Sequence, residues 1–388
     1  MKKILIICLF LLMVVLPFFN KTKINAASLP PIIKLESVKS AILMEVETKK
    51  VLYQFNPNER RAPASMTKIM TMKLVLDAIK NNEFGMNDIL TTSDYAASMG
   101  GSQIFLAPNE QMKVEDLFKS MVIASANDAA VVLAEKVSGS ESNFASKMNH
   151  TAKLLGCKNT NFQNATGLPI LNHYTTCYDL ALIACSLLKD YEEIVIPYSS
   201  MYESYIRTDS NNPFWLVNTN KMLKGNSGVD GLKTGWTNDA GYCITTTMKK
   251  DGMRLVCVVM GAESPTLRNI DAMNILNFGF NEYELITLKE KNAIIETKSD
   301  ILLSPDKFNI VTSSKVCYLK NKNNKLGDVT YKVELYHDKL RKLECDNIGK
   351  LKVFIDGNYI GESDLDLESI PKKSSFFELL YKVFSSLF

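Results

Sequence analysis

The segment Pro63-Ala64-Ser65-Met66-Thr67-Lys68 places a serine and a lysine three residues apart at the start of a predicted helix. Pro63 favours a helix start, and residues 69–79 are mostly apolar without Gly or Pro. Because residues three apart share a helix face, the Ser65 hydroxyl and the Lys68 amine are expected to approach each other. A lysine whose pKa is lowered by burial or by a neighbouring cation can accept the serine proton. The positive end of the helix dipole also favours a developing oxyanion. A capped surface helix is the alternative interpretation.

A second polar pair, in Ser125-Ala126-Asn127, lies between two predicted helices at 115–123 and 128–136. A loop at this junction can direct both side chains into a cleft. There, Ser125 could relay a proton to a leaving nitrogen, and the Asn127 amide could hold a substrate carbonyl and the Lys68 amine. Serine and asparagine are also common helix N-caps, which is the alternative for this pair.

A third segment, Lys233-Thr234-Gly235, lies at or just before a strand edge that could line a cleft. The runs 242–248 and 254–260, joined by a polar turn, predict a β-hairpin there. Lys233 and Thr234 offer a cation and a hydroxyl for a carboxylate, and Gly235 lets a ligand backbone lie close. A glycine-containing turn with a solvated lysine is the alternative.

Together the three segments resemble the ordered motifs of the penicillin-recognising serine enzymes: Ser-x-x-Lys, Ser-x-Asn sixty residues later, and Lys-Thr-Gly at 233. Over nearly the whole chain, the sequence is similar to the low-molecular-mass penicillin-binding proteins, the serine-type D-alanyl-D-alanine carboxypeptidases. Further segments that look like parts of this family are the predicted hairpin 40–55, the turn-rich loop 165–169 and residues 218–220 and 228–241.

This resemblance implies an α/β (α+β) fold of the penicillin-binding/β-lactamase-like serine transferase type, with an antiparallel sheet flanked by helices. It implies that Ser65 is the acylated nucleophile and Lys68 its general base. It implies that Ser125 and Asn127 form a second catalytic element, and that Lys233 and Thr234 bind the terminal carboxylate of the substrate. Gly235 and Trp236 would belong to the same substrate-binding segment. The backbone N–H groups of Ser65 and Trp236 would form the oxyanion hole.

The implied activity is removal of the terminal D-alanine from peptidoglycan stem peptides through an acyl-enzyme, without a cofactor and with β-lactams as covalent inhibitors. A class A β-lactamase, which shares the three motifs, needs a glutamate about a hundred residues after the serine to activate water. The region 159–169 has no acid, and no Asp or Glu occurs between Glu141 and Asp179. We therefore expect peptide trimming rather than antibiotic hydrolysis. A non-catalytic β-lactam or peptidoglycan sensor, and a transpeptidase or endopeptidase, remain alternatives.

Residues 1–26 begin with lysines, continue as an apolar run and end in small residues, a pattern typical of a secretory signal peptide. A membrane anchor is the alternative. Without these residues, which hold four lysines and no acid, 41 basic residues balance 42 acidic ones, so charge does not indicate a nucleic-acid partner. The other seven cysteines are scattered and the three histidines lack ligand spacing, so we expect neither a disulfide framework nor a metal site.

We expect the peptidase domain to span 27–285 and a small β-rich domain to span 286–370, where strand-like runs alternate with polar turns. Residues 371–388 are expected to form an amphipathic helix, too short to span a bilayer. Its apolar residues recur on one face: Phe376, Phe377, Leu380, Val383, Phe384, Leu387 and Phe388. We expect it to lie in the membrane interface, on the outer face of the cytoplasmic membrane beside the cell wall. Packing on the protein's own core is the alternative.

Overall fold

The computed structural model describes residues 33–225 and 227–385, and the chain from Leu35 onward groups into one compact unit. The predicted signal peptide at residues 1–26 and the last two apolar positions of the predicted C-terminal helix lie outside the described residues.

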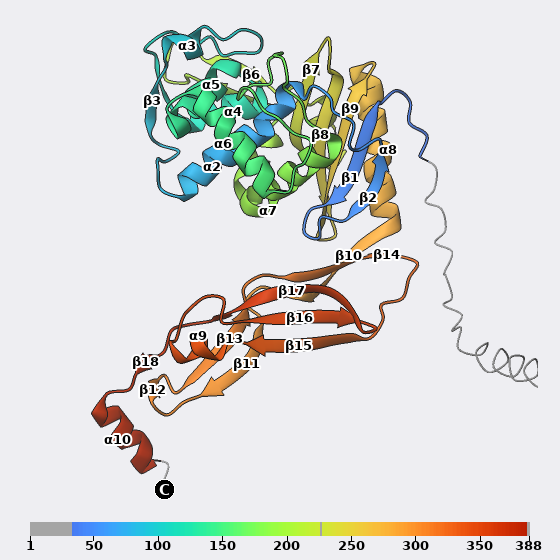
Figure 1. Cartoon of the computed structure of the whole chain (residues 1–388). Coiled ribbons are helices and arrows are strands. Elements are labelled where there is room, and N and C mark those ends of the chain that lie inside the picture. Colours follow the sequence, from blue (N-terminus) through green and yellow to red (C-terminus); the bar gives the residue numbers. More distant parts are fainter. Residues whose placement is uncertain (1–32, 226, 386–388) are drawn as a thin grey trace, which may run out of the picture. The chain divides into compact units, whose positions relative to one another are not determined.

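A five-stranded antiparallel sheet, in the order β2-β1-β9-β8-β7, forms the centre of the larger part of the unit (Figure 1). Leu43 of β1 and Leu255 of β9 face Gly279 of helix α8, whereas Ile42 and Met44 belong to the core shared with α2 and α7. Helices therefore cover both faces of the sheet. The strands are β1 Ser40–Glu45, β2 Val51–Phe55, β7 Val229–Thr237, β8 Gly241–Lys250 and β9 Met253–Ala262.

Helix α2 is buried along nearly its whole length, as expected for an apolar helix at the centre of a domain. The helical elements of this part are η2 Ala64–Thr67, α2 Lys68–Lys80, α3 Asp94–Ala97, α4 Val114–Ile123, α5 Asn127–Ser138, α6 Glu141–Leu154, α7 Cys177–Ser199, η3 Lys221–Leu223 and α8 Pro265–Glu282. Two small hairpins pair β3 Ile89–Thr91 with β4 Gln111–Lys113, and β5 Glu203–Ile206 with β6 Phe214–Val217.

The predicted hairpins at 40–55 and 242–260 and the predicted helices at 115–123 and 128–136 are confirmed. One local prediction was wrong: Ser65 lies in the 3-10 turn η2, and the α-helix itself begins at Lys68. Ala64 has a left-handed backbone with φ of 48°, so the chain enters this turn sharply instead of running straight into an α-helix. The seven cysteines from Cys157 to Cys345 are free thiols.

The C-terminal part is built mainly of strands around its own small core, as predicted from the alternating runs. Its main sheet has the order β11-β13-β17-β16-β15, and two strand pairs, β10 with β14 and β12 with β18, accompany it. The elements are β10 Tyr283–Lys289, β11 Ile294–Ser299, β12 Leu303–Ser304, β13 Lys307–Thr312, β14 Val316–Asn321, β15 Val329–Leu335, α9 His337–Arg341, β16 Gly349–Ile355, β17 Asn358–Leu367 and β18 Lys372–Lys373. The domain boundaries given above stay predictions.

The last described helix, α10 Phe376–Ser385, exposes its apolar side chains, and none of its residues is buried. Its Glu378 accepts a hydrogen bond from the Ser375 backbone, and Lys382 donates to the Leu303 carbonyl. Within the described residues, the helix is therefore not packed into a core. No helix in the described ranges meets the length and hydropathy needed to cross a membrane.

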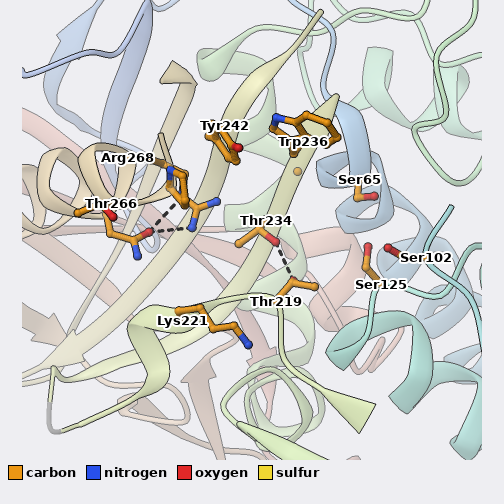
Figure 2. Close-up of a pocket in the computed structure, with 13 residues that line it drawn as sticks. Ser65, Ser102, Ser125, Thr219, Lys221, Thr234, Trp236, Tyr242, Thr266 and Arg268 are labelled. Carbon is orange, nitrogen blue, oxygen red and sulfur yellow. Dashed lines mark hydrogen bonds between the residues drawn. The ribbon is translucent and has the colours of Figure 1, made fainter. Parts of the chain in front are cut away.

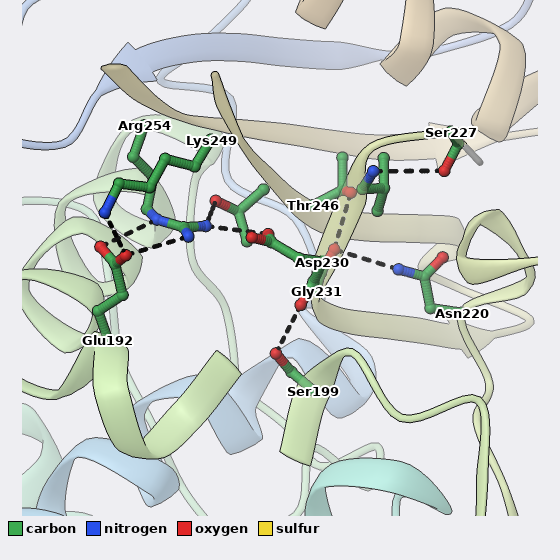
Figure 3. A network of polar contacts seen from close by, with 11 residues as sticks. Glu192, Ser199, Asn220, Ser227, Asp230, Gly231, Thr246, Lys249 and Arg254 are labelled. Carbon is green, nitrogen blue, oxygen red and sulfur yellow. Dashed lines mark hydrogen bonds and ion pairs between the residues drawn. The ribbon is translucent and has the colours of Figure 1, made fainter. Parts of the chain in front are cut away.

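A polar network fixes the start of β7 (Figure 3). Arg254 of β9 is buried and forms ion pairs with Glu192 of α7 at 3.1 Å and Asp230 of β7 at 2.9 Å. The Gly231 carbonyl accepts hydrogen bonds from Thr246 at 2.8 Å and Asn220 at 3.2 Å. The strand that carries Lys233 and Thr234 is thus tied to helix α7, to its neighbour β8, to β9 beyond it and to the 218–220 segment.

We predict that Arg254→Met lowers the unfolding free energy by about 2–4 kcal/mol, because it leaves two partly buried carboxylates without their shared cation. Lys249→Met is the matched control, since Lys249 also pairs with Glu192, at 2.7 Å, but is exposed to solvent. The control should cost less than about 1 kcal/mol. Urea unfolding of both variants tests this, and equal losses would contradict a special role of the buried arginine.

Candidate active site

The Lys68 amine lies at the centre of the site and contacts three oxygens from three segments. Its Nζ lies 3.2 Å from Ser65 Oγ and donates to Asn127 Oδ1 and to the Thr166 carbonyl, both at 2.7 Å. Burial lowers the pKa of Lys68 well below its ordinary value, and the positive charge of Lys233 lowers it further. A buried amine next to a serine hydroxyl is suited to accept that hydroxyl's proton.

The Ser125 hydroxyl is buried and has no hydrogen-bond partner among the described residues. Its backbone is left-handed, with φ of 64°, which is strained for a residue with a side chain. Ala126 occupies the N-cap position of α5, and the Asn127 side chain contacts Lys68 and the Gly100 carbonyl. The pair is therefore not a simple helix cap. An unpartnered buried hydroxyl in a strained loop is typical of a functional site.

The loop 164–169 supplies a partner of Lys68 that the sequence did not reveal. Asn164 Oδ1 accepts hydrogen bonds from the backbone N–H groups of Thr166 at 3.2 Å and Gly167 at 2.7 Å, and this turns the Thr166 carbonyl toward Lys68. Gly167 has φ of 84°, and a Cβ there would lie 1.8 Å from the Ala64 carbonyl oxygen. Only glycine allows this close contact with the turn that carries Ser65.

Strand β7 passes directly against Ser65. A Cβ on Gly235 would lie 2.9 Å from the Pro63 carbonyl oxygen and 3.1 Å from the Ser65 nitrogen. The missing side chain thus makes room for the chain around Ser65, and closeness of a ligand backbone to Gly235 stays a prediction. Trp236 follows at the cleft, with its ring 5.9 Å from that of Tyr242. An oxyanion hole formed by the backbones of Ser65 and Trp236 stays a prediction.

Lys233 is buried, so it is not a solvated turn lysine. Its Nζ donates to the Thr234 carbonyl at 3.1 Å. Burial lowers its pKa to about 7, with the charge of Arg268 as a second cause. The Thr234 hydroxyl donates to Thr219 Oγ1 at 2.7 Å and faces the cleft.

A cleft of about 530 Å³ brings Ser65, Ser125 and Thr234 together with Gly235 and Trp236 (Figure 2). The buried Lys68, Asn127 and Lys233 support this cleft from behind without lining it. The structure thus gathers all eight predicted site residues in one place.

Arg268 of α8 also lines the cleft, although no sequence motif indicates it. Its guanidinium is largely buried and contacts Asn269 Oδ1 at 2.8 and 3.0 Å and the Cys243 carbonyl at 3.4 Å. Burial lowers its pKa to about 10, which leaves it charged at neutral pH. A single arginine in a helix has no motif, so only the packing of α8 against β8 places it here. The site thus holds the Ser65 hydroxyl, the Lys68 amine behind it, the Ser125 hydroxyl, unpartnered within the described part of the chain, and, farther along, the Arg268 guanidinium. This set of groups suits acyl transfer on a substrate that carries a carboxylate.

Comparison with known proteins agrees with this geometry. Residues 25–264 match the family model described as D-alanyl-D-alanine carboxypeptidase. The chain is 43% identical over 344 residues to the D-alanyl-D-alanine carboxypeptidase DacF of Bacillus subtilis, and the match covers 88% of each chain. Among solved structures, it is similar to penicillin-binding protein 5 of Haemophilus influenzae, with a TM-score of 0.68, 27% identity and coverage of 88% and 100%. It is also similar to penicillin-binding protein D2 of Listeria monocytogenes in its ampicillin-bound form, with a TM-score of 0.57, 31% identity and coverage of 64% and 100%.

Proposed function

This chain belongs to the family of D-alanyl-D-alanine carboxypeptidases, and we propose that Ser65 is the nucleophile with which it trims peptidoglycan stem peptides. The observation that carries this proposal is the 3.2 Å distance between Ser65 Oγ and the fully buried Lys68 Nζ. The lowered pKa of Lys68 favours the uncharged amine, which is the form that can accept a proton.

In the acylation step, Lys68 takes the Ser65 proton while Ser65 Oγ attacks the carbonyl carbon between the two terminal D-alanines. The backbone N–H groups of Ser65 and Trp236 would hold the resulting oxyanion. Ser125, whose hydroxyl has no partner among the described residues, would donate its proton to the leaving nitrogen and regain one from Lys68, which returns to its uncharged form. The C–N bond then breaks, D-alanine leaves, and the remaining peptide is an ester of Ser65.

The terminal carboxylate of the substrate would bind at the far end of the cleft, to the Thr234 hydroxyl and the Arg268 guanidinium. Both groups line the cleft, and a carboxylate can accept hydrogen bonds from each. Lys233 does not line the cleft, so we assign it the role of a buried positive charge behind Thr234.

In the second step, water hydrolyses the ester, and no cofactor is required in this scheme. Lys68, acting through Ser125, would activate that water. The loop 164–169 presents the Thr166 carbonyl to Lys68, and it has no carboxylate that could serve as a separate base. β-Lactams resemble the D-Ala-D-Ala end and would therefore acylate Ser65 and be released slowly. Transfer of the acyl group to an amine, or a role as a non-catalytic sensor, are the alternatives to hydrolysis.

We predict that the protein releases D-alanine from an N-acetylated tripeptide ending in D-Ala-D-Ala, and that Ser65→Ala stops this release. Mass spectrometry after benzylpenicillin treatment should show one adduct on the peptide that contains Ser65, and none in the variant. Thr67→Ser is a suitable control that should keep both activities, because it removes one methyl group beside Ser65 and keeps the hydroxyl that contacts His173 at 2.9 Å. An adduct without D-alanine release by the wild type would favour the sensor. D-Alanine release that survives Ser65→Ala would refute the mechanism.

We predict opposite shifts of the pH profile for two charge-removing variants. Acylation by benzylpenicillin should rise with pH as Lys68 loses its proton. Lys233→Met removes a charge that lowers the pKa of Lys68, so the acidic limb should move to higher pH. Glu141→Gln removes a charge that raises this pKa, so the limb should move to lower pH. The measurement is the second-order acylation rate from pH 5 to 9, and shifts in the same direction would exclude Lys68 as the titrating base.

We also infer that the protein is exported by residues 1–26 and held at the outer face of the cytoplasmic membrane by α10. The exposed apolar side chains of α10 support the second part: Phe376, Phe377, Leu380, Tyr381, Val383 and Phe384. An amphipathic helix with such a face binds the membrane interface mainly through apolar burial. The β-rich part, at 286–370 in our division of the chain, would then act as a spacer or protein-contact module between this helix and the catalytic domain.

We predict that a mature chain ending at residue 373 no longer sediments with phosphatidylglycerol-containing vesicles, whereas the full mature chain does. A gentler variant, Leu380→Glu with Phe384→Glu, should weaken sedimentation as strongly, because two charges would enter the apolar interface. D-Alanine release from a soluble peptide should be the same in all three proteins. Continued sedimentation of the shortened chain would refute the anchor.

A further inference from the structure

The β5–β6 hairpin carries an exposed aromatic pair that the proposed catalytic steps do not use. Tyr205 and Trp215 lie directly opposite each other across the two strands and are 50% and 54% exposed. Ile206 and Leu216 point to the other side and are buried. Glu203 lies on the exposed side, and its Oε2 accepts a hydrogen bond from the Trp215 indole at 3.2 Å. We call Glu203, Tyr205 and Trp215 the aromatic face.

The chemistry of this face suits a carbohydrate. Sugar rings present C–H groups on their flat sides, which pack against aromatic rings, and hydroxyl or amide groups at their edges, which bond to carboxylates. Tyr205 and Trp215 leave two large aromatic rings exposed on one face of the hairpin, where a flat apolar surface of a ligand can pack against them.

The hairpin is held firmly to the catalytic centre. Arg207, directly after β5, donates to Glu110 Oε1 at 2.8 Å and to the Ile104 carbonyl at 2.9 Å. The Ile104 backbone N–H in turn bonds to the carboxylate of Asp128, the residue that follows Asn127. This chain of contacts fixes the aromatic face relative to the proposed catalytic asparagine.

The distance from the cleft also matches the substrate. Trp215 precedes Thr219, which lines the cleft, by four residues, so the two backbones are at most about 14 Å apart. Thr219 accepts a hydrogen bond from Thr234, where we place the terminal carboxylate, and in a stem pentapeptide five residues separate that carboxylate from the muramic acid sugar, an extended length of about 17 Å. A stem peptide held in the cleft can therefore bring its own sugar to the aromatic face.

We propose that the aromatic face binds the N-acetylated amino-sugar rings of the peptidoglycan strand whose stem peptide occupies the cleft. This inference rests on the proposed peptidase function. It makes Trp215 a determinant of preference for glycan-linked peptides over free peptides.

The test compares two substrates, a free N-acetylated tripeptide ending in D-Ala-D-Ala and a disaccharide-pentapeptide. Trp215→Ala should raise KM for the disaccharide-pentapeptide about tenfold, the scale of one lost stacking contact, and leave kcat and the kinetics on the tripeptide within about twofold of wild type. Trp215→Phe, which keeps an aromatic ring, should recover most of the affinity. Tyr359→Ala, which removes an exposed tyrosine from β17, is the control and should change neither substrate.

Equal kinetics of wild type and Trp215→Ala on both substrates, or equal losses on both, would overturn the proposal. A dimer that Trp215→Ala dissociates, with kinetics that do not depend on the sugar, would overturn it in favour of contact with a second copy.

A wild type that cleaves neither substrate would refute the peptidase function instead. In that case, titration of the Ser65→Ala protein with N-acetylglucosamine tetramer decides the sugar site. The chain has two tryptophans, so the fluorescence change should persist in Trp236→Phe and be lost in Trp215→Ala; no such change would refute the site.

Discussion

The burial of the Lys68 amine is the constraint on which the catalytic centre depends. Removing an amine from water is costly unless other groups replace the lost hydrogen bonds, and here Ser65, Asn127 and Thr166 replace them. Each partner comes from a different segment, so the three segments must meet around one nitrogen. The same burial lowers the pKa of Lys68. Desolvation therefore both organises the fold locally and prepares the amine for proton transfer.

Strand β7 provides the second wall of the site, and its position is fixed at both ends. Near its start, Asp230 and Gly231 bond to buried groups on α7, β8 and β9. Farther along, Gly235 lies against the turn that carries Ser65. A strand held in this way cannot move away from Ser65, the proposed nucleophile, without breaking buried polar contacts. Such preorganisation is what stabilisation of a developing oxyanion requires.

Most of the fold and the side chains that meet at the proposed active site could be predicted from the sequence, because motif spacing and apolar periodicity report which side chains share a face. Features that depend on the backbone conformation or on tertiary packing could not be predicted in this way. The Thr166 carbonyl carries no side-chain signal, the 3-10 turn at Ser65 depends on the left-handed Ala64, and Arg268 reaches the cleft only because α8 packs on the sheet. The close packing of Gly235 against the turn at Ser65 could not be predicted for the same reason, since its neighbour is another part of the chain.

Arg268, Lys233 and Lys68 influence one another's charge, and this influence connects substrate binding with proton transfer. Burial, with the charge of Arg268 as a second cause, lowers the pKa of Lys233 to about 7, and burial, with the charge of Lys233 as a second cause, lowers the pKa of Lys68. A substrate carboxylate bound at Thr234 and Arg268 would offset the charge of Arg268 and so favour the charged form of Lys233. A fully charged Lys233 disfavours protonation of Lys68, which keeps the base in its active form. Lys68 also contacts Asn127 and Thr166, and these bonds hold the amine beside Ser65 when its proton is absent. Recognition of the terminal carboxylate and activation of the serine would thus be coupled through one buried lysine.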